Sequence, residues 1–150
     1  MHHESRVPFI HICSLGITRK ADLTLYDGVI TIEDSTIEDP FRIETTHPPQ
    51  RIIVFDDITR PIDDYVVLEE WQVRSALSFA RQFECPSLLI HCHAGMSRSP
   101  AIALAIFVDW LGKGREEETL RELLKVVPVC TPNKLVVKIA DRVLGLEGFW

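Results

Sequence analysis

Short apolar runs alternate along this chain with longer stretches in which apolar residues recur every three or four positions. A strand that is buried on both faces of a parallel sheet is apolar throughout, so the short runs predict four strands, at residues 8–15, 28–32, 51–55 and 87–91. A short helix is expected between the first two strands. Residues 34–49 are rich in polar side chains and proline, which predicts a long surface connection in a position to border a cleft.

The segment between the third and fourth strands has its apolar residues at helical spacing, which predicts a helix over residues 65–84. Trp71 lies in this pattern and is expected in the core or at its flank rather than as a platform for a ligand. The face expected to pack on the sheet comprises Val66, Val67, Trp71, Val73, Ala76, Leu77, Ala80 and Phe83.

Two more helices are predicted after the fourth strand. Residues 101–111 are apolar nearly all round, which is typical of a helix buried at the centre of a domain. Pro100 stands where a first-turn proline is tolerated, and Gly112 and Gly114 are expected to end the helix. Residues 115–127 open with three glutamates, which suit a helix N-terminus, and are expected to turn four side chains inward: Leu120, Leu123, Leu124 and Val127.

A final helix is predicted over residues 134–144, with Thr131 as its N-cap, Pro132 at its first helical position and Gly145 at its end. Strands that first alternate with helices and are then followed by helices predict an α/β fold. It consists of a mostly parallel central sheet of four or five strands, flanked by helices. In such folds the ligand binds at the carboxyl ends of the strands.

Length and charge narrow the functions that this chain can have. With 150 residues, 46% of them hydrophobic, the chain can bury one sizeable core, so a single domain over residues 1–150 is expected. The formal net charge of −6 argues against general binding to nucleic acid or to anionic membranes. Asp109 interrupts the longest apolar run and residues 1–4 lack the pattern of a secretory signal, so a cytoplasmic protein without a membrane span is expected.

The cysteines fit a reducing compartment. Their spacing shows no pairing, which predicts reduced thiols rather than a disulfide framework. All but Cys92 are expected to be small buried hydrophobes, with a redox partnership as the alternative. Zinc binding by Cys92 and its two neighbouring histidines is disfavoured, because adjacent side chains at a strand end point to opposite sides. The four cysteines are Cys13, Cys85, Cys92 and Cys130.

Residues 91–99 read HCHAGMSRS and place a cysteine and an arginine at the two ends of a loop between the fourth strand and the next helix. Unpaired N–H groups and the positive end of the helix dipole converge on such a loop, so an anion is favoured there and Cys92 should ionise easily. Arg98 offers a planar fork of donors that matches two oxygens of a phosphoryl group. The segment therefore predicts a nucleophile in a phosphate-binding loop.

Neighbouring residues of this segment are expected to support the chemistry. Gly95 allows a positive φ and a close approach of the backbone to the anion. Ser99 can donate a hydrogen bond to the departing thiolate, and His91 is expected to orient the loop. The residues expected to contact the phosphate are His93, Ala94, Gly95, Met96, Ser97 and Arg98.

A bare Cys-x5-Arg pattern would arise by chance in about one such chain in five, but the added His, Gly and Ser reduce this to on the order of one in ten thousand. The loop resembles the His-Cys-x5-Arg-Ser/Thr signature of the cysteine-dependent protein tyrosine phosphatases. Its ending, Ala-Gly-Met-Ser-Arg-Ser, is most similar to the dual-specificity branch and to the compact bacterial tyrosine phosphatases. The resemblance runs from about residue 51 to residue 144.

Expulsion of an alkoxide or phenoxide from phosphorus needs a proton from outside this loop. Asp56 and Asp57 follow the third strand and are expected on the same rim as Cys92. Position alone leaves open whether one of them, or Asp63 or Asp64, is the acid. The run Phe-Asp-Asp at residues 55–57 resembles the acid loop of the family, and this resemblance assigns the general acid to Asp57, with Asp56 beside it.

The resemblance implies a metal-independent, two-step hydrolysis of phosphate monoesters that needs no cofactor. Cys92 would form a phosphocysteine, Arg98 and the amides of residues 93–98 would hold the phosphoryl oxygens, and Asp57 would act first as acid and then as base. The resemblance also places Asn133 at the back of the site, although a helix start explains the same residue. The implied partner is a phosphorylated protein, with phosphotyrosine ahead of phosphoserine and phosphothreonine, or a small phosphomonoester.

Two other functions stay open at this point. A sulfurtransferase also uses a cysteine in an anion-binding loop, but a rhodanese loop usually has one residue fewer before its arginine. A catalytically silent phosphate-binding module would have lost its nucleophile or its acid, whereas this chain has both Cys92 and Asp57. His93 and Met96 stand where phosphoinositide-specific relatives have lysines, which ranks inositol lipids lower, and the acidic chain argues against RNA 5′-triphosphate ends.

Overall fold

The computed structural model describes residues 7–146, so residues 1–4, which bear on the expected absence of a secretory signal, lie outside the described part. Four strands form one sheet in the order β1-β4-β2-β3, and every neighbouring pair is parallel. The α/β fold with a parallel central sheet is therefore confirmed. The strands are β1 (Phe9–Cys13), β2 (Gly28–Glu33), β3 (Gln50–Val54) and β4 (Ser87–His91).

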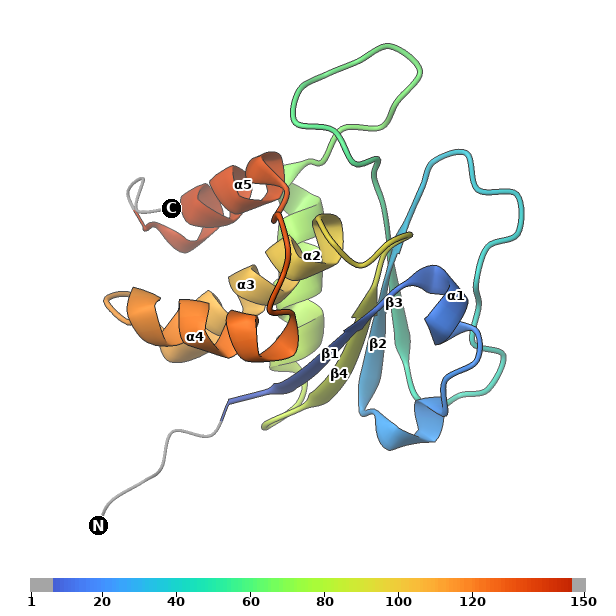
Figure 1. The fold of residues 1–150 in the computed structure, drawn as a ribbon, viewed down its shortest axis with the longest axis horizontal. Helices are drawn as coiled ribbons and strands as arrows, with labels where there is room; N and C mark the ends of the chain where they lie inside the picture. Colours follow the sequence, from blue (N-terminus) through green and yellow to red (C-terminus); the bar gives the residue numbers. More distant parts are fainter. Residues whose placement is uncertain (1–6, 147–150) are drawn as a thin grey trace.

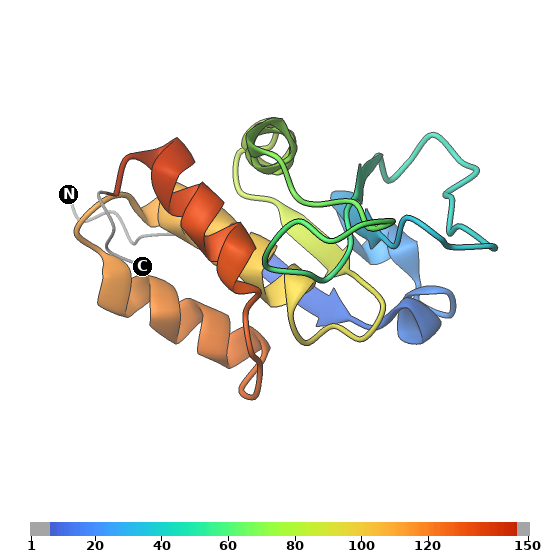
Figure 2. The same cartoon turned by 90° about the horizontal axis from the view of Figure 1, so that it is seen from above.

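Four helices pack on one side of this sheet: α2 (Glu70–Arg81), α3 (Arg98–Leu111), α4 (Glu116–Val126) and α5 (Lys134–Leu144). Figures 1 and 2 show these helices on one side, and α1 (Leu15–Thr18) on the other. The short 3₁₀ helix η1 (Leu23–Leu25) follows α1. Helix α3 is buried along most of its length, as its uniformly apolar sequence predicts, and it ends at Gly112, which has φ +90°.

The sheet is covered unequally on its two faces. Alternate strand residues such as Ile30, Leu88 and Ile90 join the large core beneath the helices. The opposite face has a smaller cluster around Val29 and Leu89, which the segments after β1 and β2 cover. No helix among residues 7–146 is long and apolar enough to cross a membrane.

Parallel strands bring three connections to the same edge of the sheet. The segments that follow β2, β3 and β4 all leave from the carboxyl ends of their strands, at the upper edge of the view in Figure 1. Residues 34–49 are almost without regular structure, in agreement with the predicted surface connection. The edge unites the loop from Cys92 to Arg98 with the two segments that border it.

Helix α2 is shorter than the predicted helix over residues 65–84, and residues 65–69 are not helical. The Val66 amide donates to the Asp56 carboxylate and the Val66 carbonyl accepts from the Asp56 amide, so these groups cannot enter a helical ladder. The helix begins after a capping box formed by Glu69 and Gln72. Trp71 is 62% exposed and Val66 is 40% exposed, so the prediction that both pack on the sheet was wrong.

The last two helices also correct the sequence-based prediction. Helix α5 spans the predicted residues, but its N-cap is Asn133 rather than Thr131, because the Asn133 side-chain oxygen accepts from the amides of Leu135 and Val136. Pro132 therefore lies before the helix and not at its first position. In α4 only Leu123 of the four expected apolar residues is fully buried, whereas Leu120 and Leu124 are each 45% exposed. Helix α4 lies at the outside of the helical layer, so a narrower face of it meets the core (Figure 2).

Candidate active site

The loop between β4 and α3 holds Cys92 at the carboxyl end of the sheet. The side chain is buried, and the Gly95 amide donates to its sulfur over 3.3 Å. Gly95 has φ +78°, and a Cβ atom there would lie 3.1 Å from the carbonyl oxygen of Cys13. The positive φ and the close approach both favour glycine, so a larger residue would strain the loop at the amide that donates to the sulfur.

Arg98 opens helix α3 and is 4% exposed. Its Nη1 donates to the Phe55 carbonyl over 2.9 Å and lies 2.7 Å from Oδ1 of Asp34. Its Nε is buried and has no hydrogen-bond partner among the described residues. An unpaired guanidinium N–H is costly to bury. The Phe55 carbonyl and Asp34 therefore hold Nη1, while the N–H group of Nε is available to donate to an anion.

Ser99 follows Arg98 in the first turn of α3 and is fully buried. Its hydroxyl has no hydrogen-bond partner among residues 7–146. Buried hydroxyls are nearly always paired, so this hydroxyl is a hydrogen-bond donor that remains available for a further partner.

His91 is buried at the end of β4 and makes two hydrogen bonds. Nδ1 lies 3.2 Å from the Cys92 carbonyl oxygen, and Nε2 lies 2.9 Å from the Thr31 hydroxyl. The Thr31 hydroxyl also accepts a hydrogen bond from the side-chain amide of Gln50 over 2.8 Å. Burial lowers the pKa of His91, so the ring is neutral at pH 7. Because a carbonyl only accepts, Nδ1 bears the proton and Nε2 accepts from Thr31.

Asp57 lies in the segment after β3 and points to the Cys92 loop. Its Oδ1 accepts from the Ser97 hydroxyl over 2.8 Å and from the side-chain amide of Asn133 over 2.8 Å. The carboxylate is exposed to solvent. Asp57, Ser97 and Asn133 come from three separate segments, and the fold brings them together at the loop from Cys92 to Arg98.

Asp56 points the other way and is buried. Its carboxylate accepts from the Ser35 amide at 3.0 Å, the Ser35 hydroxyl at 2.6 Å and the Val66 amide at 2.7 Å. Burial on its own favours the neutral acid, but these hydrogen bonds outweigh it and hold the pKa of Asp56 below its usual range. Asp56 is therefore ionised at neutral pH and occupied by structural contacts, which favours Asp57 as the acid.

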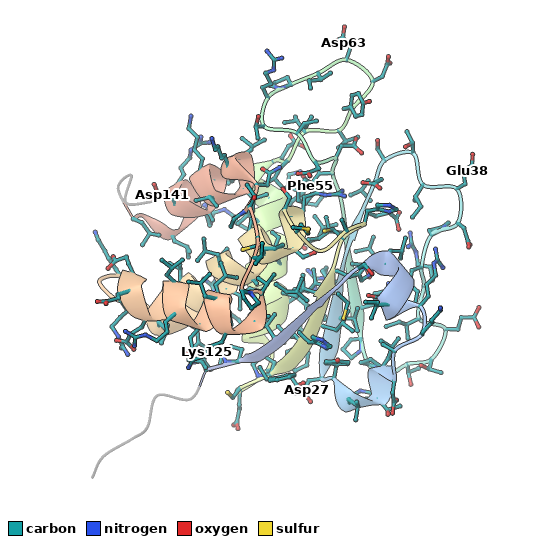
Figure 3. The ribbon with its side chains drawn as sticks, in the orientation of Figure 1. Asp27, Glu38, Phe55, Asp63, Lys125 and Asp141 are labelled. Carbon is teal, nitrogen blue, oxygen red and sulfur yellow. The ribbon has the colours of Figure 1, made fainter. Side chains whose placement is uncertain are left out.

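The other acidic candidates lie farther out. Asp63 stands at the outer tip of the loop after β3, away from Phe55 (Figure 3), and both Asp63 and Asp64 are exposed. Neither residue makes a hydrogen bond or an ion pair through its side chain within the described part of the chain. Their position does not suit proton transfer at Cys92.

The remaining loop residues differ in exposure. His93, Ala94 and Met96 are exposed, whereas Ser97 is half-buried. The Leu15 amide donates to the His93 carbonyl over 3.0 Å, which ties the loop to the start of α1. The loop therefore has one exposed rim and one side that is fixed to the sheet.

All four cysteines are free thiols. Burial raises the pKa of Cys13 and of Cys130, so both are protonated at neutral pH. In the described part of the chain, no three histidine, cysteine or acidic side chains are grouped so that they could hold a metal ion. His91 turns its ring to Thr31 and the Cys92 carbonyl, so it does not join Cys92 in a ligand set.

This chain is similar to known proteins in its fold, whereas its sequence matches none of those compared. No family model matches the sequence, and no curated protein matches it. Among solved structures, Tk-PTP in its active form superposes with a TM-score of 0.60 at 19% identity, over 95% of this chain and 93% of that one. This chain has the fold of the protein tyrosine and dual-specificity phosphatases.

Other structures with the phosphatase fold give the same result. Human DUSP28 matches with a TM-score of 0.60 at 14% identity, over 93% of each chain. PTPMT1 matches with a TM-score of 0.61 at 16% identity, over 91% of this chain and 90% of that one, and it has also been solved in complex with PI(5)P. The match to Tk-PTP covers 95% of this chain, so it includes most of the first 50 residues, where the sequence resembles the family only in its pattern of strand and loop.

Two features of the site were missed by sequence analysis. One is the ion pair between Asp34 and Arg98. The other is the pair of hydrogen bonds that joins Gln50 to Thr31 and Thr31 to His91. No local sequence motif marks either of them. Asp34 directly follows β2, so its place at a strand end was the available signal. An acidic residue in a polar connection does not reveal its partner without the fold.

Proposed function

We propose that this chain is a metal-independent phosphatase, a single domain that hydrolyses phosphate monoesters through a phosphocysteine on Cys92. The observation that carries the proposal is the state of Arg98. Its buried guanidinium has Nη1 engaged by Phe55 and Asp34 while Nε is unpaired, beside a buried cysteine at a helix N-terminus. A tetrahedral phosphoryl group fits such a free edge, because two of its oxygens can accept from one guanidinium.

In the first step the Cys92 thiolate attacks phosphorus in line with the leaving oxygen. The S–P bond forms as the P–O bond breaks, and Asp57 gives its proton to the leaving oxygen. Arg98 and the amides of residues 93–98 hold the other three oxygens, on which charge is concentrated in the transition state. Ser97 and Asn133, which donate to Asp57, keep its carboxyl group facing the loop.

In the second step water attacks the phosphocysteine. Asp57, now ionised, takes a proton from the water as the O–P bond forms and the S–P bond breaks. The departing thiolate gains the hydrogen bond that Ser99 has available, since the Ser99 hydroxyl has no other partner. His91 keeps the loop fixed through its bond to the Cys92 carbonyl.

Hydrolysis of para-nitrophenyl phosphate in the presence of a chelator tests the proposal. The wild type is expected to release nitrophenolate, and Cys92→Ser to lose at least about 10³-fold in kcat. Asp57→Asn should slow phosphotyrosine hydrolysis about 10²-fold, and nitrophenyl phosphate hydrolysis less, because nitrophenolate leaves without a proton. Acid quenching of the Asp57→Asn reaction should trap phosphate on Cys92.

The same assay separates the alternatives. Activity on thiosulfate in place of phosphate esters would identify a sulfurtransferase. Phosphate binding without turnover would identify a silent binding module. The fold alone does not separate such a module from an enzyme, because the fold of this chain also matches a human protein named as tyrosine phosphatase-like, at a TM-score of 0.60 and 17% identity.

For the substrate we propose a phosphorylated protein, with phosphotyrosine ahead of phosphoserine and phosphothreonine. The exposed rim formed by His93 and Met96 has no lysine that would hold the additional phosphates of an inositol lipid. We place the protein in the reducing cytoplasm, because the nucleophile acts only as a free thiol.

A further inference from the structure

A hollow of about 410 Å³ lies next to the proposed catalytic groups. Asp57 and Ser97 form its inner border, and two segments form its walls, residues 58–62 after β3 and residues 131–134 before and at the start of α5. Figures 1 and 2 both show these segments side by side. We call this feature the Arg60 hollow. A volume of this size holds one or two side chains of a bound peptide.

Two positive side chains line the hollow and are free. Arg60 and Lys134 are exposed, and neither takes part in an ion pair or a side-chain hydrogen bond within the described residues. Most other arginines of the described part are engaged, for example Arg42 with Glu33 and Arg81 with Asp109. In a chain with a net charge of −6, two unengaged cations on one hollow create a local positive field.

The backbone adds to this field. Helix α5 has eleven residues and directs its N-terminus, with Lys134 as its first residue, to the hollow. Asp57 is the one acidic side chain that lines the hollow within the described residues, and its carboxyl group is engaged by Ser97 and Asn133. The rest of the lining is apolar or neutral, including Ile58, Ile62 and Pro132.

We propose that the Arg60 hollow binds a carboxylate side chain of the substrate, close in sequence to the phosphorylated residue. The inference rests on the proposed phosphatase function and names the substrate class more closely. The cations provide the charge complement, and the apolar walls suit the methylene groups of a glutamate. The enzyme would thus select phosphorylated sites in acidic sequences.

Pairs of phosphotyrosine peptides test the proposal. The two peptides of a pair differ only at one position near the phosphotyrosine, which holds Glu in one peptide and its neutral isostere Gln in the other. The readout is the kcat/KM of the Glu peptide divided by the kcat/KM of the Gln peptide. For the wild type we expect a ratio of about five at one or more positions, the effect of one well-formed exposed ion pair. Because the ratio is taken within one variant, a general change in activity cancels.

Arg60→Gln and Lys134→Gln should each reduce the ratio, and the double variant should bring it to about one. Lys138→Gln is the matched control, because Lys138 is exposed on the same helix one turn farther on and does not line the hollow. The control should keep the wild-type ratio.

A wild-type ratio of one at every position, with phosphotyrosine still hydrolysed, would overturn the hollow as an acidic subsite and leave the phosphatase function intact. A wild-type Glu-to-Gln ratio that persists in the Arg60→Gln/Lys134→Gln double variant would also overturn the hollow as an acidic subsite. If neither the peptides nor nitrophenyl phosphate are hydrolysed, the proposed function fails, and this inference fails with it.

Discussion

The Arg98 guanidinium is held in place through one nitrogen and has a free donor at another. Nη1 is held by a carbonyl and by Asp34, so the plane of the guanidinium is set before any ligand arrives. In the proposed function, holding the fork in advance would reduce the entropy that is lost when phosphate binds. At the residue scale we therefore propose Asp34 as a positioning residue, which acts through Arg98 and need not contact the reacting atoms.

Asp34→Asn is expected to lower kcat/KM for nitrophenyl phosphate about tenfold, because the neutral amide loses the charge-assisted part of the bond to Arg98. Glu38→Gln is the control, since Glu38 lies in the same connection, is exposed (Figure 3), and makes no side-chain hydrogen bond or ion pair within the described residues. Steady-state kinetics and inhibition by vanadate measure the effect. A loss in unfolding free energy with unchanged vanadate affinity would show that Asp34 acts only on stability.

At the element scale, the start of helix α5 joins two segments of the site. Asn133 caps the helix with its side-chain oxygen, which accepts from the amides of Leu135 and Val136, and uses its side-chain nitrogen to donate to Asp57. Its backbone amide donates to the Ser97 carbonyl. One residue thus stabilises the helix and aligns the proposed acid.

Substitution of Asn133 separates its role as the N-cap of α5 from its role as a hydrogen-bond donor to Asp57. Asn133→Ser keeps an N-cap oxygen but loses the donor to Asp57, so stability should change little while phosphotyrosine turnover falls several-fold. Asn133→Ala loses both and should also cost about 1 kcal/mol in unfolding free energy. Urea denaturation and turnover, measured on both variants, give the comparison. Equal turnover in Asn133→Ser and the wild type would contradict the aligning role.

At the scale of the whole molecule, Asp56 ties together three segments that meet at the carboxyl edge of the sheet. Its carboxylate joins the chain after β2, through Ser35, with the chain before α2, through Val66, and the residue itself follows β3. Charge-assisted hydrogen bonds of this kind keep the three connections in fixed relation around Cys92.

The lowered pKa of Asp56 gives this tie a pH dependence. A carboxyl group whose pKa is lower in the folded state than in the unfolded state stabilises the fold above its unfolded pKa, and this contribution is lost as the pH falls through the folded pKa. Asp56→Asn should therefore cost about 2 kcal/mol at pH 7. The difference from the wild type should shrink once the pH falls below about 4, which urea denaturation at both pH values measures. A pH-independent difference would show that charge is not the cause.

Much of the fold was predictable from local patterns. The four strands, the buried helix α3 and the end of α5 at Gly145 all follow from apolar spacing and from glycine at a helix end. The first part of the predicted helix over residues 65–84 was wrong, because Val66 forms its hydrogen bonds with Asp56. Apolar spacing in the sequence carries no sign of such a distant partner.

The sequence by itself determined the Cys92 loop between a strand and a helix, because its proposed chemistry depends on contiguous residues and on the two elements that flank them. It also determined the parallel α/β class. Only the tertiary structure decided that Asp57 rather than Asp56 faces the loop, that Asp34 holds Arg98, and that Asn133 serves two segments at once. These pairings join residues far apart in the chain, and their energies depend on burial and direction, which exist only once the strands are parallel and their carboxyl ends meet.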